Sequence, residues 1–242
     1  MRQETAARLL DLNRGFYQRF GRAFAAKRSR LQPGAARLLH RIRPRESVLD
    51  LGCGHGLFAS ALVSAGHRGM VVGLDSSAEL LDVARHRKTL GSVALAQADL
   101  ADPNWPLALG AGQANLFDWI VAFAVLHHLP SDDVRRGVVR QCHGLALPEG
   151  RMVVSVWDFL ASPRWRARLV PWETVSIDES DVDPDDFLLD WREGGLGYRY
   201  VHHFTPETLT ALAAASGFTV EEAYRSDGEG GRLGLYQVWR KA

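Results

Sequence analysis

One short stretch places glycines at every second position directly after a carboxylate: Asp50-Leu51-Gly52-Cys53-Gly54-His55-Gly56. Apolar residues precede it, and apolar residues at helical spacing follow it, so the pattern predicts a buried strand, a sharp turn and the start of a helix. Glycine lets a backbone approach a ligand closely because it has no Cβ atom and adopts positive φ readily. The helix start adds free N–H groups and a positive dipole end. The stretch therefore predicts a ligand-binding turn.

Two kinds of cofactor suit such a turn. A dinucleotide site of the G-x-G-x-x-G type would need its third glycine at position 57, where this chain has Leu57. Asp50, just before the glycines, would repel a pyrophosphate and attract a cationic ligand. The spacing therefore favours a positively charged cofactor over a dinucleotide.

A second carboxylate, Asp75, ends the apolar run 70–74 and lies 19 residues after Gly56. At about this distance an acidic residue binds the ribose hydroxyls in βαβ nucleotide sites. The alternative is that Asp75 caps the next helix, but Ser76 and Glu79 already have capping-box spacing. We therefore expect Asp75 to bind a ribose.

The elements that position these residues alternate between strand and helix, which predicts an α/β fold with a doubly wound sheet. After a helix that runs from Thr205 to Gly217, two last strands are expected as a hairpin. Ligands gather at the carboxyl ends of the strands in such sheets, and Gly52, Asp75, Asp99 and His127 all follow strands. The predicted strands, in chain order, are 48–51, 70–74, 93–97, 117–123, 151–157, 218–223 and 233–239.

Charge is distributed unevenly along the chain. Residues 1–45 carry twelve Lys and Arg against two acidic residues, and residues 173–193 carry nine acidic residues against one Arg. The basic segment has the pattern of an amphipathic helix followed, after Pro33-Gly34, by a second helix over 35–42. Three readings stay open for it: a helix that covers the sheet with solvated arginines, a transit peptide, or a positive collar for a polyanion. The insertion 158–204 should shape a substrate pocket, because it follows the fifth strand.

Length and composition set the outer bounds. The 242 residues predict a single domain over 1–242, with 1–45 as a helical extension. Cys53 and Cys142 are too few for a disulfide framework, so we expect a reducing, cytoplasmic location. No apolar run reaches the roughly 18 residues of a membrane helix, and no signal peptide is expected.

The string Asp50 to Gly56 resembles motif I of class I S-adenosylmethionine (SAM) methyltransferases, and the final hairpin resembles the ending of their seven-stranded, Rossmann-like sheet. The resemblance implies SAM as cofactor, with Asp99 beside the adenine. Asp50, being acidic, would suit the cationic ligand. The cofactor residues that it implies are Asp50, Gly52, Cys53, Gly54, Gly56, Asp75, Ser76, Asp99, Leu100, Ala124 and His127.

Further patches resemble the methyltransferases that esterify the carboxymethyl group of a tRNA wobble uridine. They are the spaced residues Tyr17, Phe24, Arg28 and Pro33; the string 124–128 (Ala-Val-Leu-His-His); Val156-Trp157; 186–191 (Asp-Phe-Leu-Leu-Asp-Trp); and 199–204 (Arg-Tyr-Val-His-His-Phe). Lys27, Gln32, Asp190 and Val201 depart from that family's pattern. The resemblance implies tRNA as substrate and a small activating protein as partner. A small carboxylate or other metabolite is the alternative acceptor, and a non-catalytic SAM- and RNA-binding module is the alternative class.

A carboxylate acceptor is already ionised near pH 7, so its methylation needs no general base. By the family match, Arg28 and Arg199 would hold an anionic acceptor, Tyr17 and Tyr200 would line the pocket, and His128 would face the acceptor. His127 would pack near the cofactor. The pairs 127–128 and 202–203 predict no metal site, because adjacent residues of an extended chain point in opposite directions.

Overall fold

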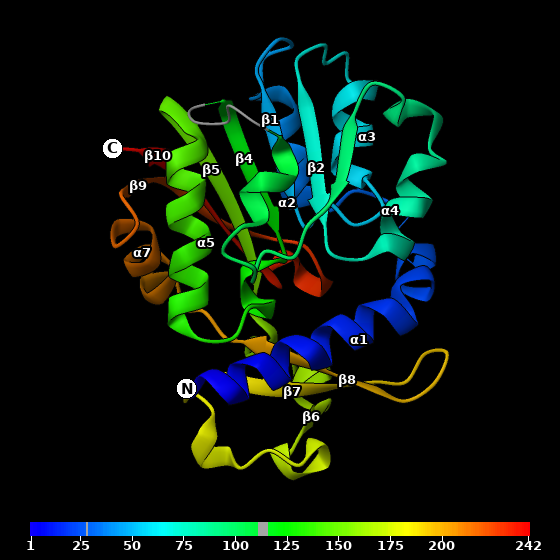
Figure 1. The fold of residues 1–242 in the computed structure, drawn as a ribbon, viewed down its shortest axis with the longest axis vertical. Coiled ribbons are helices and arrows are strands. Elements are labelled where there is room, and N and C mark those ends of the chain that lie inside the picture. The colour runs from blue at the N-terminus through cyan, green and yellow to red at the C-terminus, as the bar shows by residue number, and fades with distance from the viewer. Residues whose placement is uncertain (28, 111–115) are drawn as a thin grey trace.

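The computed structural model describes residues 1–27, 29–110 and 116–242, with the backbone alone at positions 24, 27 and 229. A seven-stranded sheet of order β3-β2-β1-β4-β5-β10-β9 crosses its centre (Figure 1). Only β10 runs antiparallel to both of its neighbours, β5 and β9. The strands are β1 (Val48–Leu51), β2 (Val71–Asp75), β3 (Ala94–Gln97), β4 (Phe117–Phe123), β5 (Ala146–Trp157), β9 (Phe218–Ser226) and β10 (Gly234–Lys241). The predicted sheet, with its antiparallel end, is confirmed.

Helices cover both faces of this sheet (Figure 1). On β4, Ile120 and Ala122 pack with the cluster that contains residues of α5 and α7. The alternate residues Trp119 and Val121 pack with residues of α2 and α3 on the other face. The helices are α1 (Gln3–Lys27), α2 (Pro33–Ala36), α3 (Leu57–Ser64), α4 (Ala78–Arg85), α5 (Asp132–Leu145), α6 (Pro163–Arg166) and α7 (Pro206–Ala214). Two-sided burial explains why β4 is apolar along almost its whole length.

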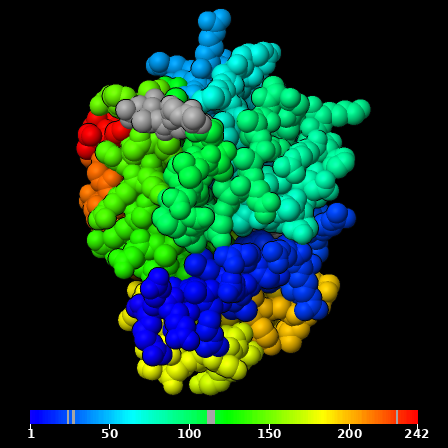
Figure 2. Space-filling view, viewed as in Figure 1, coloured from blue at the N-terminus to red at the C-terminus, as the bar shows by residue number. Residues whose placement is uncertain are grey.

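The insertion after β5 forms a separate antiparallel sheet of three strands, β6 (Leu169–Val170), β7 (Asp186–Trp191) and β8 (Gly197–His202). The long helix α1 lies between this small sheet and the carboxyl ends of the parallel strands (Figure 1). In Figure 2, α1, in dark blue, runs as a band between the body of the molecule and the yellow insertion. The N-terminal helix thus covers the edge where ligands gather, whereas one of our readings had it covering a face of the sheet.

The basic N-terminal segment and the acidic insertion form ion pairs with each other. The Met1 ammonium group lies 2.7 Å from Asp183, and Arg2 pairs with Asp181. Arg8 donates to the carbonyl oxygens of Val175 and Ser176, at 3.2 and 2.8 Å. The basic N-terminal segment is therefore bound to the acidic insertion by ion pairs and hydrogen bonds.

Two local predictions were wrong in detail. The second helix stops early, as α2 and a 3₁₀ turn over Arg37–His40. Ser77, not Ser76, caps α4, because the Ser77 hydroxyl accepts the Leu80 N–H.

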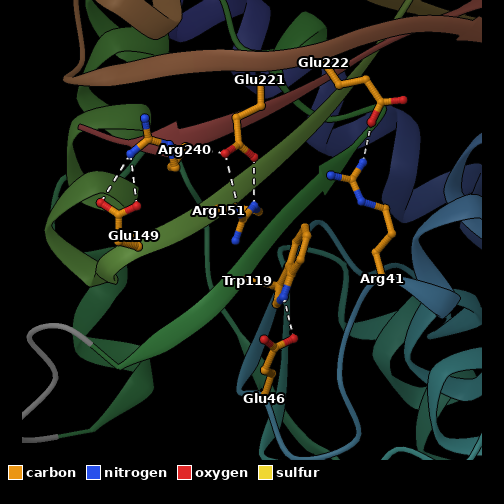
Figure 3. Close-up of polar contacts among 8 residues, drawn as sticks. All are labelled: Arg41, Glu46, Trp119, Glu149, Arg151, Glu221, Glu222 and Arg240. Atoms are coloured by element: carbon orange, nitrogen blue, oxygen red, sulfur yellow. Dashed lines mark hydrogen bonds and ion pairs between the residues drawn. The ribbon is translucent and has the colours of Figure 1, made fainter.

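Over part of the sheet, charged side chains form a ladder of ion pairs (Figure 3). Glu221 lies 2.8 Å from Arg151 and 3.2 Å from Arg240. Arg240 also pairs with Glu149, and Arg41 pairs with Glu222. The buried indole of Trp119 donates to Glu46 at 2.8 Å. The aliphatic parts of these long side chains cover apolar surface on the sheet face where Trp119 lies.

Candidate active site

The glycine turn between β1 and α3 needs glycine for conformation and for space. Gly52, Gly54 and Gly56 all have positive φ, at 62°, 55° and 75°. A Cβ atom on Gly52 would lie 2.5 Å from Val125 Cγ2, and one on Gly56 would lie 2.4 Å from Leu90 Cδ1. The turn therefore leaves bare backbone at the edge of the sheet, as predicted from its glycines.

Asp50, at the start of this turn, is a buried carboxyl group with 2% of its surface exposed. Its Oδ2 atom has no hydrogen-bond partner among the residues that the structure describes. Burial, with a smaller contribution from the Asp75 charge, raises the pKa of Asp50 to about 8. A buried carboxyl oxygen beside a cavity is costly unless a ligand pairs with it, so Asp50 fits a cationic group.

Asp75 is held in place by two backbone donors. Its Oδ2 accepts the Gly54 N–H at 2.7 Å, and its Oδ1 accepts the Ser77 N–H at 2.8 Å. Burial raises the pKa of this carboxyl group. Each oxygen has a second lone pair, so the pair of oxygens remains able to accept two neighbouring hydroxyls.

Two cavities meet at the glycine turn. Cavity 1, of about 160 Å³, contains Asp75 and Ser76 and, from the segment after β3, Asp99 and Leu100. Cavity 2, of about 330 Å³, contains Asp50 and Cys53. Both are lined by Gly52, Gly54, Phe123, Ala124 and Trp157. A ligand with a nucleoside at one end and a charged tail at the other fits across the turn.

One wall of cavity 1 comes from α1, which contributes Leu10, Asn13, Arg14 and Tyr17. Arg14 lies 2.8 Å from Asp99 and also pairs with Asp11. Asp99 accepts the Ala101 N–H at 3.0 Å through its other oxygen. The carboxylate expected beside an adenine is thus in contact with the helix that closes the cavity.

His128 and Tyr17 form a polar pair in the same wall. The Tyr17 hydroxyl lies 2.9 Å from His128 Nε2, and His128 Nδ1 lies 3.1 Å from the Tyr200 carbonyl oxygen. A carbonyl oxygen only accepts, so Nδ1 carries the proton. In the neutral ring Nε2 is then the basic nitrogen, and it accepts the Tyr17 hydroxyl.

Sequence reasoning missed Asn13, whose amide is buried against this pair. It donates to the carbonyl oxygens of His128 and Tyr200, at 3.0 and 3.1 Å, and accepts the Tyr200 N–H at 2.8 Å. A signal was present: an asparagine, a poor helix former, stands on the apolar stripe between Leu9 and Phe16.

Several predicted residues do not line either cavity. Arg199 is buried, with 1% exposed, and its guanidinium lies 4.7 to 5.8 Å from the ring centres of Phe16, Trp157, Trp165 and Trp191. This enclosure differs from the predicted contact with an acceptor. Arg28 lies outside the described residues.

Tyr200 also differs from expectation, whereas His127 packs beside the cavities without lining either of them. The Tyr200 hydroxyl donates to Asp186 at 2.6 Å and lies 3.3 Å from Arg135, so its side chain points into the contact between the small sheet and α5. His127 is fully buried and packs on Trp157, 4.9 Å between ring centres. Successive side chains of a β-strand face opposite sides of the sheet, so Arg199 and Tyr200 do not point into one pocket. Tyr17 and His128, by contrast, do line cavity 1.

Comparison with known proteins gives the class. Residues 22–223 match the family model described as a methyltransferase domain, so the chain belongs to that family. It is a SAM-dependent methyltransferase with a Rossmann-like sheet.

Particular relatives share parts of the chain. A candidate methyltransferase of Encephalitozoon cuniculi is 29% identical over 85% of this chain and 86% of its own. The ubiquinone biosynthesis O-methyltransferase of Xanthomonas axonopodis is 31% identical over 52% of this chain. The match spans 45% of that enzyme, so this chain covers about half the length of such relatives.

Solved structures support the fold. A SAM-dependent methyltransferase of Methanosarcina mazei has a TM-score of 0.65 at 20% identity, over 88% of this chain and 98% of its own. A 1,6-didemethyltoxoflavin-N1-methyltransferase of Burkholderia thailandensis, solved with bound 1,6-didemethyltoxoflavin and S-adenosylhomocysteine, has a TM-score of 0.64 at 21% identity, over 100% of this chain and 91% of its own.

The residues present fit SAM. The orphaned oxygen of Asp50 suits a cationic group in cavity 2, and the Asp75 carboxylate suits ribose hydroxyls in cavity 1. Within the described ranges, no three His, Cys, Asp or Glu side chains gather as a metal site would need. None of the helices described there is long and apolar enough to span a bilayer.

Proposed function

We propose that the protein transfers the methyl group of SAM to a hydroxyl oxygen of a small molecule. One observation carries the proposal: the Tyr17–His128 pair in the wall of cavity 1, with the proton of His128 fixed on Nδ1. A hydroxyl acceptor must lose its proton to become a good nucleophile, whereas a carboxylate acceptor has no proton to lose near pH 7. A basic ring nitrogen in the wall therefore favours the hydroxyl.

When bound, SAM would supply a methyl group on a positively charged sulfur, and the sulfur would leave as a neutral thioether when the methyl group passes to the acceptor oxygen. Asp75 would hold the ribose, and Asp50 would pair with the cationic end. The Tyr17 hydroxyl accepts the proton of the acceptor and passes its own to His128 Nε2. The His128 ring then carries one positive charge, and its Nδ1–H stays on the Tyr200 carbonyl. Trp157, which lines both cavities, helps to exclude water.

The cover over the site favours a small acceptor. Helix α1 walls cavity 1 on the side of Tyr17 and His128, where the acceptor would bind. Relatives of known name include an O-methyltransferase of ubiquinone biosynthesis, which supports an oxygen acceptor.

A tRNA wobble uridine is the second candidate, supported by the basic segment 1–45 and the signature-like patches. Part of that segment is engaged within the chain, since Met1, Arg2, Arg14 and Arg22 lie against Asp183, Asp181, Asp99 and Asp82. We therefore rank tRNA below a small hydroxyl compound. An activating partner protein belongs with the tRNA proposal.

The test is methyl transfer from radiolabelled SAM to four separate panels: phenols and catechols, aliphatic hydroxy compounds, carboxylic acids, and bulk tRNA. We expect turnover with a hydroxyl compound. His128→Asn should lower that turnover about 100- to 10,000-fold, the usual size of a general-base contribution, with SAM affinity unchanged by calorimetry. Methylation of carboxylic acids or tRNA alone, at full rate in His128→Asn, would overturn the proposal.

A further inference from the structure

Asn13 is a polar residue on the buried stripe of α1. Its side chain lies in the middle of the helix, with Leu9 and Phe16 buried on either side along the same stripe. Only 6% of Asn13 is exposed. A buried amide in such a position must be hydrogen-bonded to be tolerated, and its three contacts satisfy both N–H groups and the oxygen.

The chemistry of its partners fixes how this amide is oriented. The Tyr200 N–H can only donate, so the atom 2.8 Å away is the amide oxygen. The carbonyl oxygens of His128 and Tyr200 can only accept, so each takes one N–H of Nδ2. No other orientation of the amide satisfies all three groups.

These contacts tie three elements together. Tyr200 belongs to β8, the edge strand of the small sheet, and edge strands leave backbone groups unpaired on one side. The Asn13 amide pairs with the N–H and C=O of Tyr200 as a neighbouring strand would. Its second N–H holds the carbonyl of His128, in the 3₁₀ turn after β4.

The Tyr200 carbonyl oxygen is therefore shared. It accepts one N–H from Asn13 and one from the His128 ring, both at 3.1 Å. If this carbonyl moved away, the Nδ1–H group of His128 would lose its hydrogen-bond acceptor. Without that acceptor, the proton would be free to move to Nε2, and the ring would present no basic nitrogen to Tyr17.

We propose that Asn13 is a positioning residue for methyl transfer: it holds the Tyr200 carbonyl against His128 and so keeps Nε2 as the proton acceptor. The inference rests on the proposed function of His128. It assigns to α1 a task beyond closing the cavity, which is to choose the tautomer of the base.

Asn13→Asp tests this with little change in volume. The carboxyl group still accepts the Tyr200 N–H, but even when protonated it has only one O–H for the two carbonyl oxygens that Asn13 serves with two N–H groups. Arg8→Ala is the matched control, because Arg8 also joins α1 to the insertion, at Val175 and Ser176, without touching His128.

The first readout is the tautomer of His128, measured by long-range ¹H–¹⁵N correlation on protein labelled at histidine, with His128→Asn to assign the signals. We expect the Nδ1–H tautomer in the wild-type protein and in Arg8→Ala. Asn13→Asp should show mixed or Nε2–H signals. This measurement needs no acceptor, and the wild-type spectrum is informative whether or not the variant folds.

The second readout is turnover as a function of pH. Asn13→Asp should lower kcat about 10- to 100-fold and move the acidic limb of its pH profile, with SAM affinity within about threefold of wild type. Arg8→Ala should change neither kcat nor the profile.

An Nε2–H tautomer in the wild-type protein, or an unchanged tautomer and pH profile in Asn13→Asp, would overturn the positioning role. If instead the tautomer behaves as expected but His128→Asn retains full turnover, the proposed function fails and the positioning of the ring stands. The two failures are thus distinguishable.

Discussion

The two halves of the site are built in different ways. The cofactor half, Asp50–Gly56 with Asp75 and Asp99, consists of short segments at the carboxyl ends of parallel strands. The acceptor half joins residues that are distant in the sequence: Tyr17 and His128 are 111 positions apart, and Asn13 and Tyr200 are 187 apart. The first half is set by local chain geometry, and the second exists only once α1, β4 and the small sheet have come together.

Their hydrogen bonding differs as well. Asp50 in the cofactor half keeps a buried oxygen without a partner in the described part of the chain. In the acceptor half, Asn13 uses its oxygen and both N–H groups on neighbouring backbone. The cofactor half thus offers a polar group to a ligand, whereas the polar groups of Asn13 in the acceptor half are paired within the protein.

The largest effect is expected from a substitution that removes contacts of the acceptor half and leaves the cofactor half unchanged. Asp186 is buried, accepts from the Tyr200 hydroxyl at 2.6 Å and lies 2.7 Å from His202. Asp186→Ala removes one partner from a buried polar network, so we expect a loss of about 3 kcal/mol in the free energy of unfolding, measured with urea. SAM affinity should remain in the folded fraction. Asp185→Ala, at an exposed neighbour, is the control and should cost little; a parallel loss of SAM affinity in Asp186→Ala would show that the halves are not separate.

The converse change disables the cofactor half. Gly56→Val places a branched side chain at φ 75°, with Cβ 2.4 Å from Leu90. We expect SAM affinity to fall about 100-fold, or about 2.7 kcal/mol, by calorimetry. Gly15→Ala, in α1 where an added Cβ meets nothing within 4 Å, should instead stabilise the protein by about 0.5 to 1 kcal/mol. Unchanged SAM affinity in Gly56→Val would refute the placement of the cofactor at this turn.

Asp50 allows the comparison to be sharpened through pH. Its pKa of about 8 means that the carboxyl group holds a proton at pH 7 in the protein without cofactor. A cationic ligand favours the ionised form, so SAM binding should release a proton below pH 8, and affinity should rise with pH up to about 8 and then level off. Calorimetry in buffers of different ionisation enthalpy measures this release, and Asp50→Asn should abolish its share.

The same raised pKa has a consequence for stability. A folded-state pKa above the unfolded value means that the folded protein binds the extra proton, so stability without cofactor should fall as pH rises from about 4 to 8. Thermal unfolding of Asp50→Asn should show a smaller fall over this range; an identical fall in both proteins would contradict the assignment.

The smallest effect is expected far from both halves, in the ladder of Figure 3. Glu221 and its partners Arg151 and Arg240 are about one quarter to one third exposed, at 26%, 34% and 36%. Glu221→Gln should cost less than about 1 kcal/mol, and less at high salt, because solvent screens such pairs. Urea unfolding at two salt concentrations tests this, and SAM affinity should not change.

Much of the cofactor half was predictable from sequence. Apolar runs of strand length predicted the core, and for β4 the predicted and observed bounds coincide at Phe117–Phe123. The glycines and Asp75 were predictable because they lie at or just after the ends of their strands, so a local pattern fixes their place at the edge of the sheet.

The acceptor half was only partly predictable. Tyr17 and His128 were named from a family resemblance, but their hydrogen bond depends on where α1 docks. The side chains of Arg199 and Tyr200 leave β8 in opposite directions, one into aromatic rings and one toward Asp186. Asn13 was missed because its partners are backbone groups, which a sequence does not distinguish from any others.

The position of α1 has a consequence for the catalytic cycle. Arg14 and Tyr17 of this helix line cavity 1, and Asn13 contacts the insertion, as does Met1 just before the helix. If the site opens by movement of this helix, SAM binding and product release both depend on the same opening. Turnover at saturating substrate would then be limited by the rate of that opening, and a slower opening would slow SAM binding and product release together.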